Sequence, residues 1–146
     1  MADNSDHQDI IDVLDRYSYA LDTRDWAMLD DVFHSDVSSD YGGFQLDGRA
    51  ELVKTIAEYL DPCGPSQHLL GNYRITVEGD EAGSTCYVRV VHVGAGDRAT
   101  LQPYEAIGTY RDHLRRTPQG WRILHRHFDV RIELGDVTVL GAPRTR

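Results

Sequence analysis

The sequence predicts an α+β fold in which N-terminal helices pack on a curved antiparallel sheet. Two features of the 146 residues indicate this arrangement. Apolar residues recur every three or four positions before Pro65, and at every second position after it. No internal repeat, low-complexity tract or interdomain linker interrupts the chain. The length suits one folding unit, so we expect a single domain spanning residues 1–146.

Three helices are expected in the first part of the chain. Over residues 6–22, Ile10, Leu14, Tyr17 and Leu21 fall on one face of a helix. The segment TRDWAMLDDVF, residues 23–33, predicts a second, shorter helix with its own apolar residues facing inward. A third helix is expected over residues 48–60. It should end at the following DPCGP, because prolines do not continue a helix.

Strands are expected in the rest of the chain. The segment SDVSSDYGGF, residues 35–44, predicts a short strand that ends in a Gly-Gly turn. Four longer strands are predicted over residues 67–78, 83–93, 100–115 and 120–134, separated by the turn signals EGDEAG, GAGDRA and TPQG. Such short connections favour an antiparallel meander. The helices would fill one face of this sheet and leave a pocket at its open end.

Composition and charge exclude several classes of partner. Hydrophobic residues make up 40% and charged residues 27%, which is typical of a globular protein in water. The net charge of −9 argues against nucleic acid or an anionic membrane as partner, since both would repel the protein. The first ten residues lack an apolar leader, no run is long enough to span a membrane, and Cys63 and Cys86 form no CxxC motif. We therefore expect a cytoplasmic protein.

Asp22 and His68 are the first candidates for chemistry. Helical spacing places Asp22 at the edge of the apolar stripe, where it is either a solvated helix-end carboxylate or a catalytic group. Strand alternation places His68 on the same face as Asn72, where a histidine is often only part of a core or a rim. An aspartate that accepts the Nδ1–H of this histidine would make its Nε2 a competent base.

Two tyrosines and a second histidine could support such a base. The hydroxyl of Tyr17, on the same helix as Asp22, or of Tyr41, at a strand end, could polarise a carbonyl. Each is equally compatible with a buried aromatic whose hydroxyl is satisfied. His92 could act as an acid or form part of a pocket wall.

A metal or nucleotide site is not predicted. His125, His127 and Asp129 share a strand face, but an HxH pair without further ligands is a weak metal signal. The chain has no phosphate-binding glycine loop and no GxSxG motif. We expect neither a metal nor another cofactor.

The order of several motifs resembles a known family. LDTRDW, DVF, SSDY, QHLLGN and GWRILHRHFDVRI together resemble the SnoaL-like branch of the nuclear transport factor 2-like (NTF2-like) superfamily, and especially scytalone dehydratases. The resemblance covers about residues 10–134. It implies a cone-shaped, cystatin-like α+β barrel with a deep, mostly apolar cavity, assembled as a homodimer or homotrimer.

The resemblance also implies roles for individual residues. Asp22 and His68 match the pair that abstracts a proton in scytalone dehydratases, and Tyr41 matches a tyrosine that holds a water near the substrate carbonyl. His92 matches a second histidine there, and Tyr17 a catalytic tyrosine of bile acid dehydratases.

This chain also departs from scytalone dehydratases. Their second water-holding tyrosine is Leu21 here, the Ser and Asn pair on their penultimate strand has no clear counterpart in EAIGTYRDH, and their C-terminal segment is shortened. The substrate is therefore expected to differ. The expected pocket residues are Leu21, Trp26, Asn72, His92, His127 and Arg131.

These observations lead to one function hypothesis and two alternatives. The first is a cofactor-independent lyase that dehydrates a hydrophobic cyclic small molecule, with His68 as base and Asp22 as its partner. The second is a polyketide cyclase or ketosteroid-isomerase-like enzyme. The third is a non-catalytic protein like the small subunit of ring-hydroxylating dioxygenases. The sequence does not distinguish dehydration from isomerisation or cyclisation.

Overall fold

Three helices and a curved, unclosed sheet build the protein, as the sequence predicted. The computed structural model describes residues 4–142. Helix α1 (Asn4–Thr23) and the 3₁₀ helix η1 (Trp26–Asp31) are followed by strands β1 (Phe33–Asp40) and β2 (Gln45–Asp47) and helix α2 (Arg49–Leu60). Strands β3 (Ser66–Glu78), β4 (Glu81–His92), β5 (Tyr104–Thr117) and β6 (Gly120–Leu134) then form the meander. Short 3₁₀ turns η2 (Gly96–Arg98) and η3 (Val137–Val139) complete the chain.

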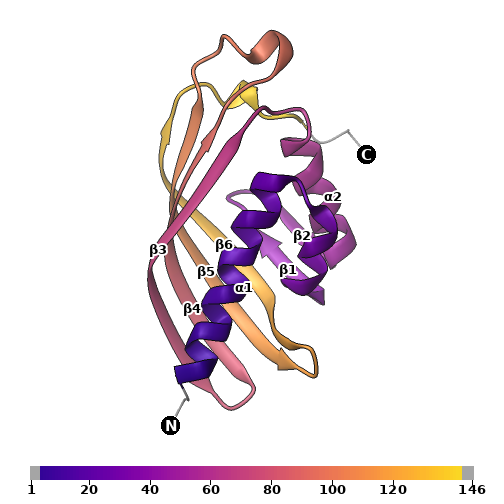
Figure 1. Cartoon of the computed structure of the whole chain (residues 1–146), viewed down its shortest axis with the longest axis vertical. Coiled ribbons are helices and arrows are strands. Elements are labelled where there is room, and N and C mark those ends of the chain that lie inside the picture. Colours follow the sequence, from indigo (N-terminus) through magenta and orange to yellow (C-terminus); the bar gives the residue numbers. More distant parts are fainter. Residues whose placement is uncertain (1–3, 143–146) are drawn as a thin grey trace.

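The six strands lie in the order β2-β1-β6-β5-β4-β3. The long strands pair antiparallel, whereas β1 and β6 pair in parallel. Strand β2 was not predicted. It folds back on β1 after the Gly-Gly turn and forms one edge of the sheet. As Figure 1 shows, α1 runs across the concave side of the sheet, and α2 lies beside β1 and β2. One end of the sheet is therefore left without a helix over it.

Several predicted boundaries differ from the observed ones for local reasons. The second helix is a 3₁₀ helix of six residues, capped by the side chain of Asp25. Strand β5 begins at Tyr104 rather than at residue 100, since η2 and the proline at 103 interrupt the extended backbone. Strand β4 begins at Glu81, two residues earlier than predicted, because the turn before it is tighter.

Register shifts curve the sheet and change which residues face inward. One shift falls in β3 between Gly71 and Arg74, where Asn72 adopts a left-handed conformation with φ 53°. Another falls in β6 at Arg131, opposite Ile107 and Gly108 of β5. A Cβ atom at Gly108 would lie 2.0 Å from the carbonyl oxygen of Asp129, so this close approach of two strands requires glycine. Such bulges bend a strand and reverse its alternation.

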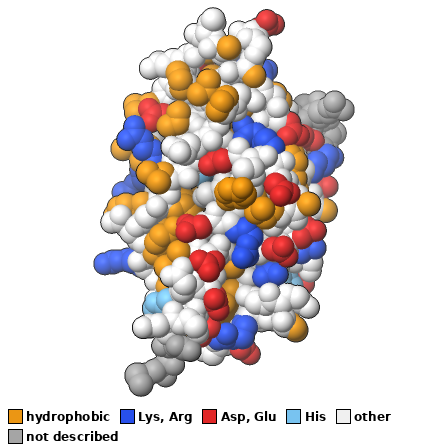
Figure 2. All heavy atoms as spheres, viewed as in Figure 1, with side chains coloured by type: hydrophobic (Ala, Val, Ile, Leu, Met, Phe, Trp, Pro, Cys, Tyr) orange, Lys and Arg blue, Asp and Glu red, His pale blue; other side chains and the backbone are white. Residues whose placement is uncertain are grey.

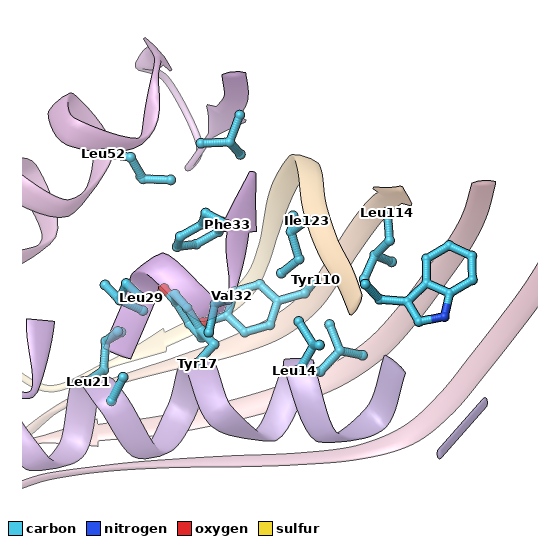
Figure 3. Packing of buried hydrophobic residues seen from close by; sticks show 14 of the residues in the cluster. Leu14, Tyr17, Leu21, Leu29, Val32, Phe33, Leu52, Tyr110, Leu114 and Ile123 are labelled. Atoms are coloured by element: carbon cyan, nitrogen blue, oxygen red, sulfur yellow. The ribbon is translucent and has the colours of Figure 1, made fainter. Parts of the chain in front are cut away.

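The core lies between α1 and the concave face of the sheet (Figure 3). Helix α1 contributes one buried stripe, and β5, β6, η1 and α2 supply the opposing side chains. Residues labelled in Figure 3 are Leu14, Tyr17, Leu21, Leu29, Val32, Phe33, Leu52, Tyr110, Leu114 and Ile123. This packing fixes the end of α1, and with it Asp22, against the start of β3.

The surface carries charges of both signs. On the face in Figure 2, acidic and basic side chains are interspersed among hydrophobic ones, so the net charge of −9 does not form one acidic block there. Within residues 4–142, no helix is both long enough and apolar enough to cross a membrane.

Candidate active site

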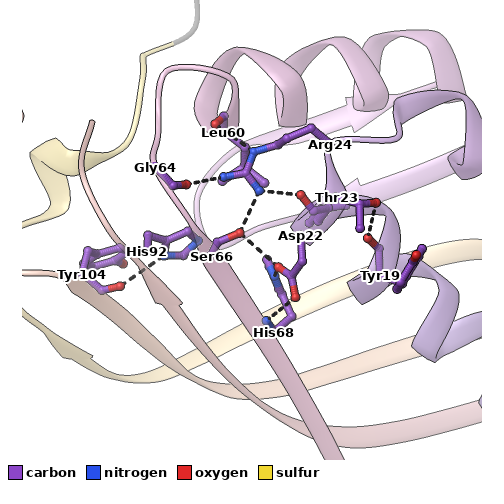
Figure 4. Close-up of polar contacts among 11 residues, drawn as sticks. Tyr19, Asp22, Thr23, Arg24, Leu60, Gly64, Ser66, His68, His92 and Tyr104 are labelled. Carbon is purple, nitrogen blue, oxygen red and sulfur yellow. Dashed lines mark hydrogen bonds and ion pairs between the residues drawn. The ribbon is translucent and has the colours of Figure 1, made fainter. Parts of the chain in front are cut away.

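Asp22 and His68 meet at the junction of α1 and β3. Oδ1 of Asp22 lies 2.7 Å from Nδ1 of His68, and Oδ2 accepts the backbone N–H of His68 at 2.8 Å. The hydroxyl of Ser66 donates a third hydrogen bond to Oδ1 at 3.0 Å (Figure 4). Both carboxylate oxygens of Asp22 therefore accept hydrogen bonds. Because His68 donates to this carboxylate from both its backbone N–H and its ring, the orientation of the imidazole is fixed.

Arg24 ties the segments around this pair together, although the sequence analysis did not single it out. Its guanidinium donates to the carbonyls of Leu60 at 3.2 Å and Gly64 at 2.7 Å, and to Ser66 Oγ at 2.8 Å. It also donates to the carbonyl of Leu21 at the end of α1. Its backbone is left-handed, with φ 57°. The guanidinium of Arg24 therefore links the ends of α1 and α2 to the start of β3 (Figure 4).

The hydrogen bonds define the protonation state of the pair. Burial alone would raise the pKa of Asp22, but the hydrogen bonds from His68 and Ser66 and the nearby imidazole more than offset it, so the pKa lies below its usual value. Because this carboxylate can only accept, the proton on His68 resides on Nδ1. Nε2 of His68 has no hydrogen-bond partner within the described part of the chain. That nitrogen is free to accept a proton.

A second imidazole lies against His68. The rings of His92 and His68 meet edge to face, with centroids 5.8 Å apart. Nδ1 of His92 donates to the carbonyl of Tyr104 at 3.2 Å. Burial and the neighbouring His68 lower the pKa of His92 to about 4, so this ring is neutral near pH 7. His92 therefore contributes a neutral ring to the cavity wall beside His68.

Tyr17 and Tyr41 form a hydroxyl pair in the same cavity. Their oxygens lie 3.0 Å apart, and the ring of Tyr17 is edge-on to that of His68 at 6.2 Å. Burial raises the pKa of Tyr41 well above its usual value, and the neighbouring Tyr17 raises it further. The hydroxyl of Tyr41 therefore keeps its proton near neutral pH. One hydroxyl of the pair donates to the other, so one proton of the pair is left to donate to a bound oxygen.

These groups line a cavity of about 560 Å³, a size that suits a small organic ligand. Aromatic and aliphatic side chains dominate its wall. Within the described part of the chain it is lined by Tyr17, Leu21, Tyr41, Gly42, Phe44, Ile56, Tyr59, Leu60, His68, Val90, His92, Tyr104, Ala106, Tyr110, His127, Phe128, Asp129, Val130, Glu133, Val137 and Leu140. None of these is lysine or arginine, so a bound ligand would have no direct contact with a lysine or arginine side chain of this lining.

Of the residues predicted to line the pocket, Leu21, His92 and His127 do so. His127 lies at the rim, where its Nδ1 is 3.3 Å from a carboxylate oxygen of Asp40. His125 is elsewhere on the surface and contacts Ser38 Oγ at 2.6 Å.

Three pocket predictions are wrong. Asn72 lies at the bulge of β3, which turns it to solvent instead of continuing the inward face of His68. Arg131 is at the register shift of β6; its side chain is 66% exposed and paired with Asp129. Trp26 is the first residue of η1 and donates its indole N–H to Asp61 at 2.9 Å, away from the cavity lining.

A buried ion pair beneath the tyrosines was also missed by the sequence analysis. Arg126 Nε and Nη2 donate to the two carboxylate oxygens of Asp112 at 2.7 and 2.8 Å, and both side chains are fully buried. The guanidinium carbon lies 4.3 Å from the ring centroid of Tyr17 and 4.0 Å from that of Tyr110. One signal was available: Asp112 stands between Tyr110 and Leu114 in an otherwise apolar alternation. A buried aspartate requires a cation or several donors.

Metal ligands do not cluster in the structure. Among residues 4–142, no group of three or more His, Cys, Asp and Glu side chains is arranged to hold an ion. Cys63 and Cys86 are both free.

Comparison with known proteins places the chain in a family. Residues 3–127 match the SnoaL-like domain, and the protein belongs to this family, within the NTF2-like superfamily. A Mycobacterium tuberculosis protein of uncharacterized function is 38% identical over 131 residues, covering 86% of each chain.

Solved structures share the fold over almost the whole chain. A Novosphingobium aromaticivorans protein named "putative aromatic ring hydroxylase" is 26% identical, with a TM-score of 0.85 over 95% of this chain and 99% of its own. A "putative scytalone dehydratase" from the same organism is 21% identical, with a TM-score of 0.78 over 96% and 93%. An NTF2-like superfamily protein from Salmonella enterica is 20% identical, with a TM-score of 0.78 over 90% and 94%. The last two likenesses concern the fold alone.

Proposed function

We propose that the protein is a cofactor-independent lyase of the dehydratase type. Its substrate would be a hydrophobic cyclic small molecule with a hydroxyl group β to a carbonyl. The observation that carries this proposal is the 2.7 Å contact between Asp22 and Nδ1 of His68 at the wall of an apolar cavity. This contact leaves Nε2 of His68 as an available base, because Asp22 fixes the tautomer.

The reaction would proceed in two steps that return the enzyme to its starting state. His68 Nε2 removes the proton from the carbon next to the carbonyl, and the electron pair moves onto the carbonyl oxygen. The Tyr17–Tyr41 hydroxyl pair, 3.0 Å apart, donates to this developing enolate. The carbonyl then re-forms, the C–O bond to the β-hydroxyl breaks, and the imidazolium of His68 gives its proton to the leaving group. Water and an α,β-unsaturated ketone result.

The available groups can supply a substantial rate acceleration. A positioned general base contributes about 10²–10⁴-fold, and an oxyanion donor about a further 10²–10³-fold. Asp22 adds to the first contribution because its carboxylate, whose pKa lies below the usual value, stays ionised and stabilises the imidazolium. The apolar wall excludes water and strengthens these electrostatic effects.

A screen with matched histidine variants tests the proposal. The wild-type protein is incubated with a panel of β-hydroxy cyclic ketones, and formation of the conjugated enone is followed by its ultraviolet absorbance. His68→Gln should abolish the turnover seen with wild type. His125→Gln, which removes a surface histidine that does not line the cavity, should retain it. Equal turnover by folded His68→Gln and wild-type protein would contradict the proposal.

A non-catalytic assembly subunit is the second candidate function. The observation that favours it is the 26% identity and TM-score of 0.85 to the Novosphingobium protein named as an aromatic ring hydroxylase. The Asp22–His68 pair argues against it, because an assembly subunit has no need for an oriented base in its cavity. This second function would be supported if a large partner subunit copurified with the protein from the native host. The His68→Gln variant should then copurify with the same subunit in the same amount.

A further inference from the structure

The Arg126–Asp112 pair is difficult to explain as a device for stability. Both side chains are fully buried, and a buried ion pair contributes little net stability because both charges lose their hydration. Nη1 of Arg126 also has no hydrogen-bond partner in the described part of the chain, although it is buried. An apolar pair of similar volume would avoid both costs.

The position of Arg126 suggests a different role. Its guanidinium lies against the rings of both Tyr17 and Tyr110, at 4.3 and 4.0 Å from their centroids, where these two rings meet edge to face. The hydroxyl of Tyr17 in turn contacts that of Tyr41, and all three tyrosines line the cavity. Arg126 itself does not line it. The positive charge therefore lies behind the hydroxyl pair, separated from the cavity by aromatic rings.

Burial makes this charge effective over several ångströms. Electrostatic interactions weaken far less in a water-excluded interior than in solution. The negative charge of Asp112 opposes the field of Arg126 at the tyrosines. The guanidinium is in direct contact with the rings of Tyr17 and Tyr110, so its charge has the larger influence there. Burial has the largest influence on the pKa of Tyr41 and raises it, whereas the charge of Arg126 lowers this pKa more than Asp112 raises it.

We propose that Arg126 is a positioning residue for the Tyr17–Tyr41 pair, and that its buried charge stabilises negative charge on a ligand oxygen bound to these hydroxyls. Asp112 holds the guanidinium against the two rings by its bidentate contact. The inference deepens the proposed function, because an enolate oxygen is the ligand atom on which such charge would develop. It predicts that the cavity binds an oxyanion more tightly than a neutral ligand of the same shape.

Binding of enolate mimics tests this inference without turnover. Naphthalene, 2-naphthol and substituted 2-naphthols of increasing acidity are titrated into the protein at one pH, and the dissociation constants are compared. Wild type should bind the more acidic naphthols progressively tighter. Arg126→Met combined with Asp112→Leu removes both charges without leaving either unpaired. It should reduce this preference by about tenfold or more while leaving the affinity for naphthalene unchanged.

A second ion pair provides a matched control. Arg116 also makes a bidentate contact with an aspartate, Asp6, at 2.8 and 3.0 Å, and stacks on Trp121 at 4.5 Å, outside the cavity lining. Arg116→Met combined with Asp6→Asn should therefore leave the naphthol preference intact. Arg126→Lys, which retains the positive charge, should keep part of the preference for acidic naphthols.

The outcomes separate this inference from the proposed function. An equal loss of naphthalene and naphthol affinity in the Arg126 and Asp112 double variant would indicate a structural role and overturn the inference. Absence of any naphthol preference in wild type would overturn it as well. A clear preference in a protein that shows no His68-dependent turnover would sustain the inference and contradict the lyase.

Discussion

Oδ1 of Asp22 and Nδ1 of His68 are 2.7 Å apart although the residues are 46 positions apart in the chain. The last turn of α1 supplies the carboxylate and the first residues of β3 supply the imidazole. A contact between the ends of two elements depends on how these elements are held together. Arg24 and Ser66 hold these two elements together, so the orientation of His68 and the stability of the junction are coupled.

Replacing Asp22 by asparagine should reduce kcat by about 10²–10⁴-fold with any β-hydroxy ketone that the wild-type protein turns over. An amide in this place can donate to Nδ1, which would favour the tautomer protonated on Nε2 and remove the base. The substitution should also lower the free energy of unfolding by about 1.5–3 kcal/mol, because charge-assisted hydrogen bonds are lost. Steady-state kinetics and urea unfolding measure the two effects.

The control for this substitution is Asp9→Asn, on the exposed side of the same helix. It should leave kcat unchanged and alter stability only slightly. Full activity of Asp22→Asn would show that the tautomer of His68 is set in some other way.

Arg24→Met should lower the free energy of unfolding by about 2–3 kcal/mol, because the guanidinium satisfies carbonyls of Leu21, Leu60 and Gly64. Activity should fall with it, since Ser66 loses the donor that orients its hydroxyl toward Asp22. Chemical denaturation and kinetics of the same sample check both effects. A stability equal to that of wild type would mean that packing alone holds the junction.

Tyr41→Phe should lower kcat by about 10²–10³-fold and leave KM nearly unchanged, because the hydroxyl would act on charge that develops after binding. Tyr59→Phe is a suitable control, since Tyr59 lines the same cavity but lies outside the hydroxyl pair. If Tyr41→Phe instead raised KM and left kcat unchanged, the hydroxyl of Tyr41 would be assigned to substrate binding.

Stability should fall as the pH decreases from about 6.5 to about 4, owing to His92. The pKa of this buried ring is lowered from 6.5 to about 4, so within this window the unfolded chain binds a proton that the folded one does not. The free energy of unfolding should therefore decrease by up to about 1.4 kcal/mol for each pH unit as the pH falls, because of this histidine. Denaturation curves across the window measure the slope.

His92→Leu should flatten this part of the pH profile, because it removes the titrating group while preserving an apolar wall. An unchanged slope would assign the acid sensitivity to other residues. Asp22, whose pKa is also lowered, contributes stability that is lost only at more acidic pH, below the usual range of a carboxyl.

Periodicity predicted the fold well because long elements repeat their pattern many times. The apolar stripe of α1 and the alternation of β4 and β5 were sufficient to predict the helices and the meander. The three-residue strand β2 was missed, since so short a segment has no period to detect.

The candidate site was predicted only in part, for a related reason. Asp22, His68, Tyr17 and Tyr41 lie close together, as the motif order implied. Asn72 was assigned to the wrong face because the bulge in β3 reverses the alternation, and the preceding Gly71 was the only local sign of that bulge in the sequence. Arg126 was missed for a similar reason, since a register shift in β6 precedes it and changes the face on which it lies.

The most direct test of His68 as a carbon base is solvent deuterium exchange into a cyclic ketone without a leaving group, followed by proton NMR. Wild type should accelerate loss of the signal from the carbon next to the carbonyl, and His125→Gln should do so equally. His68→Gln should reduce the rate to the level of buffer alone. Exchange by His68→Gln at the wild-type rate would contradict the assignment of His68 as the base.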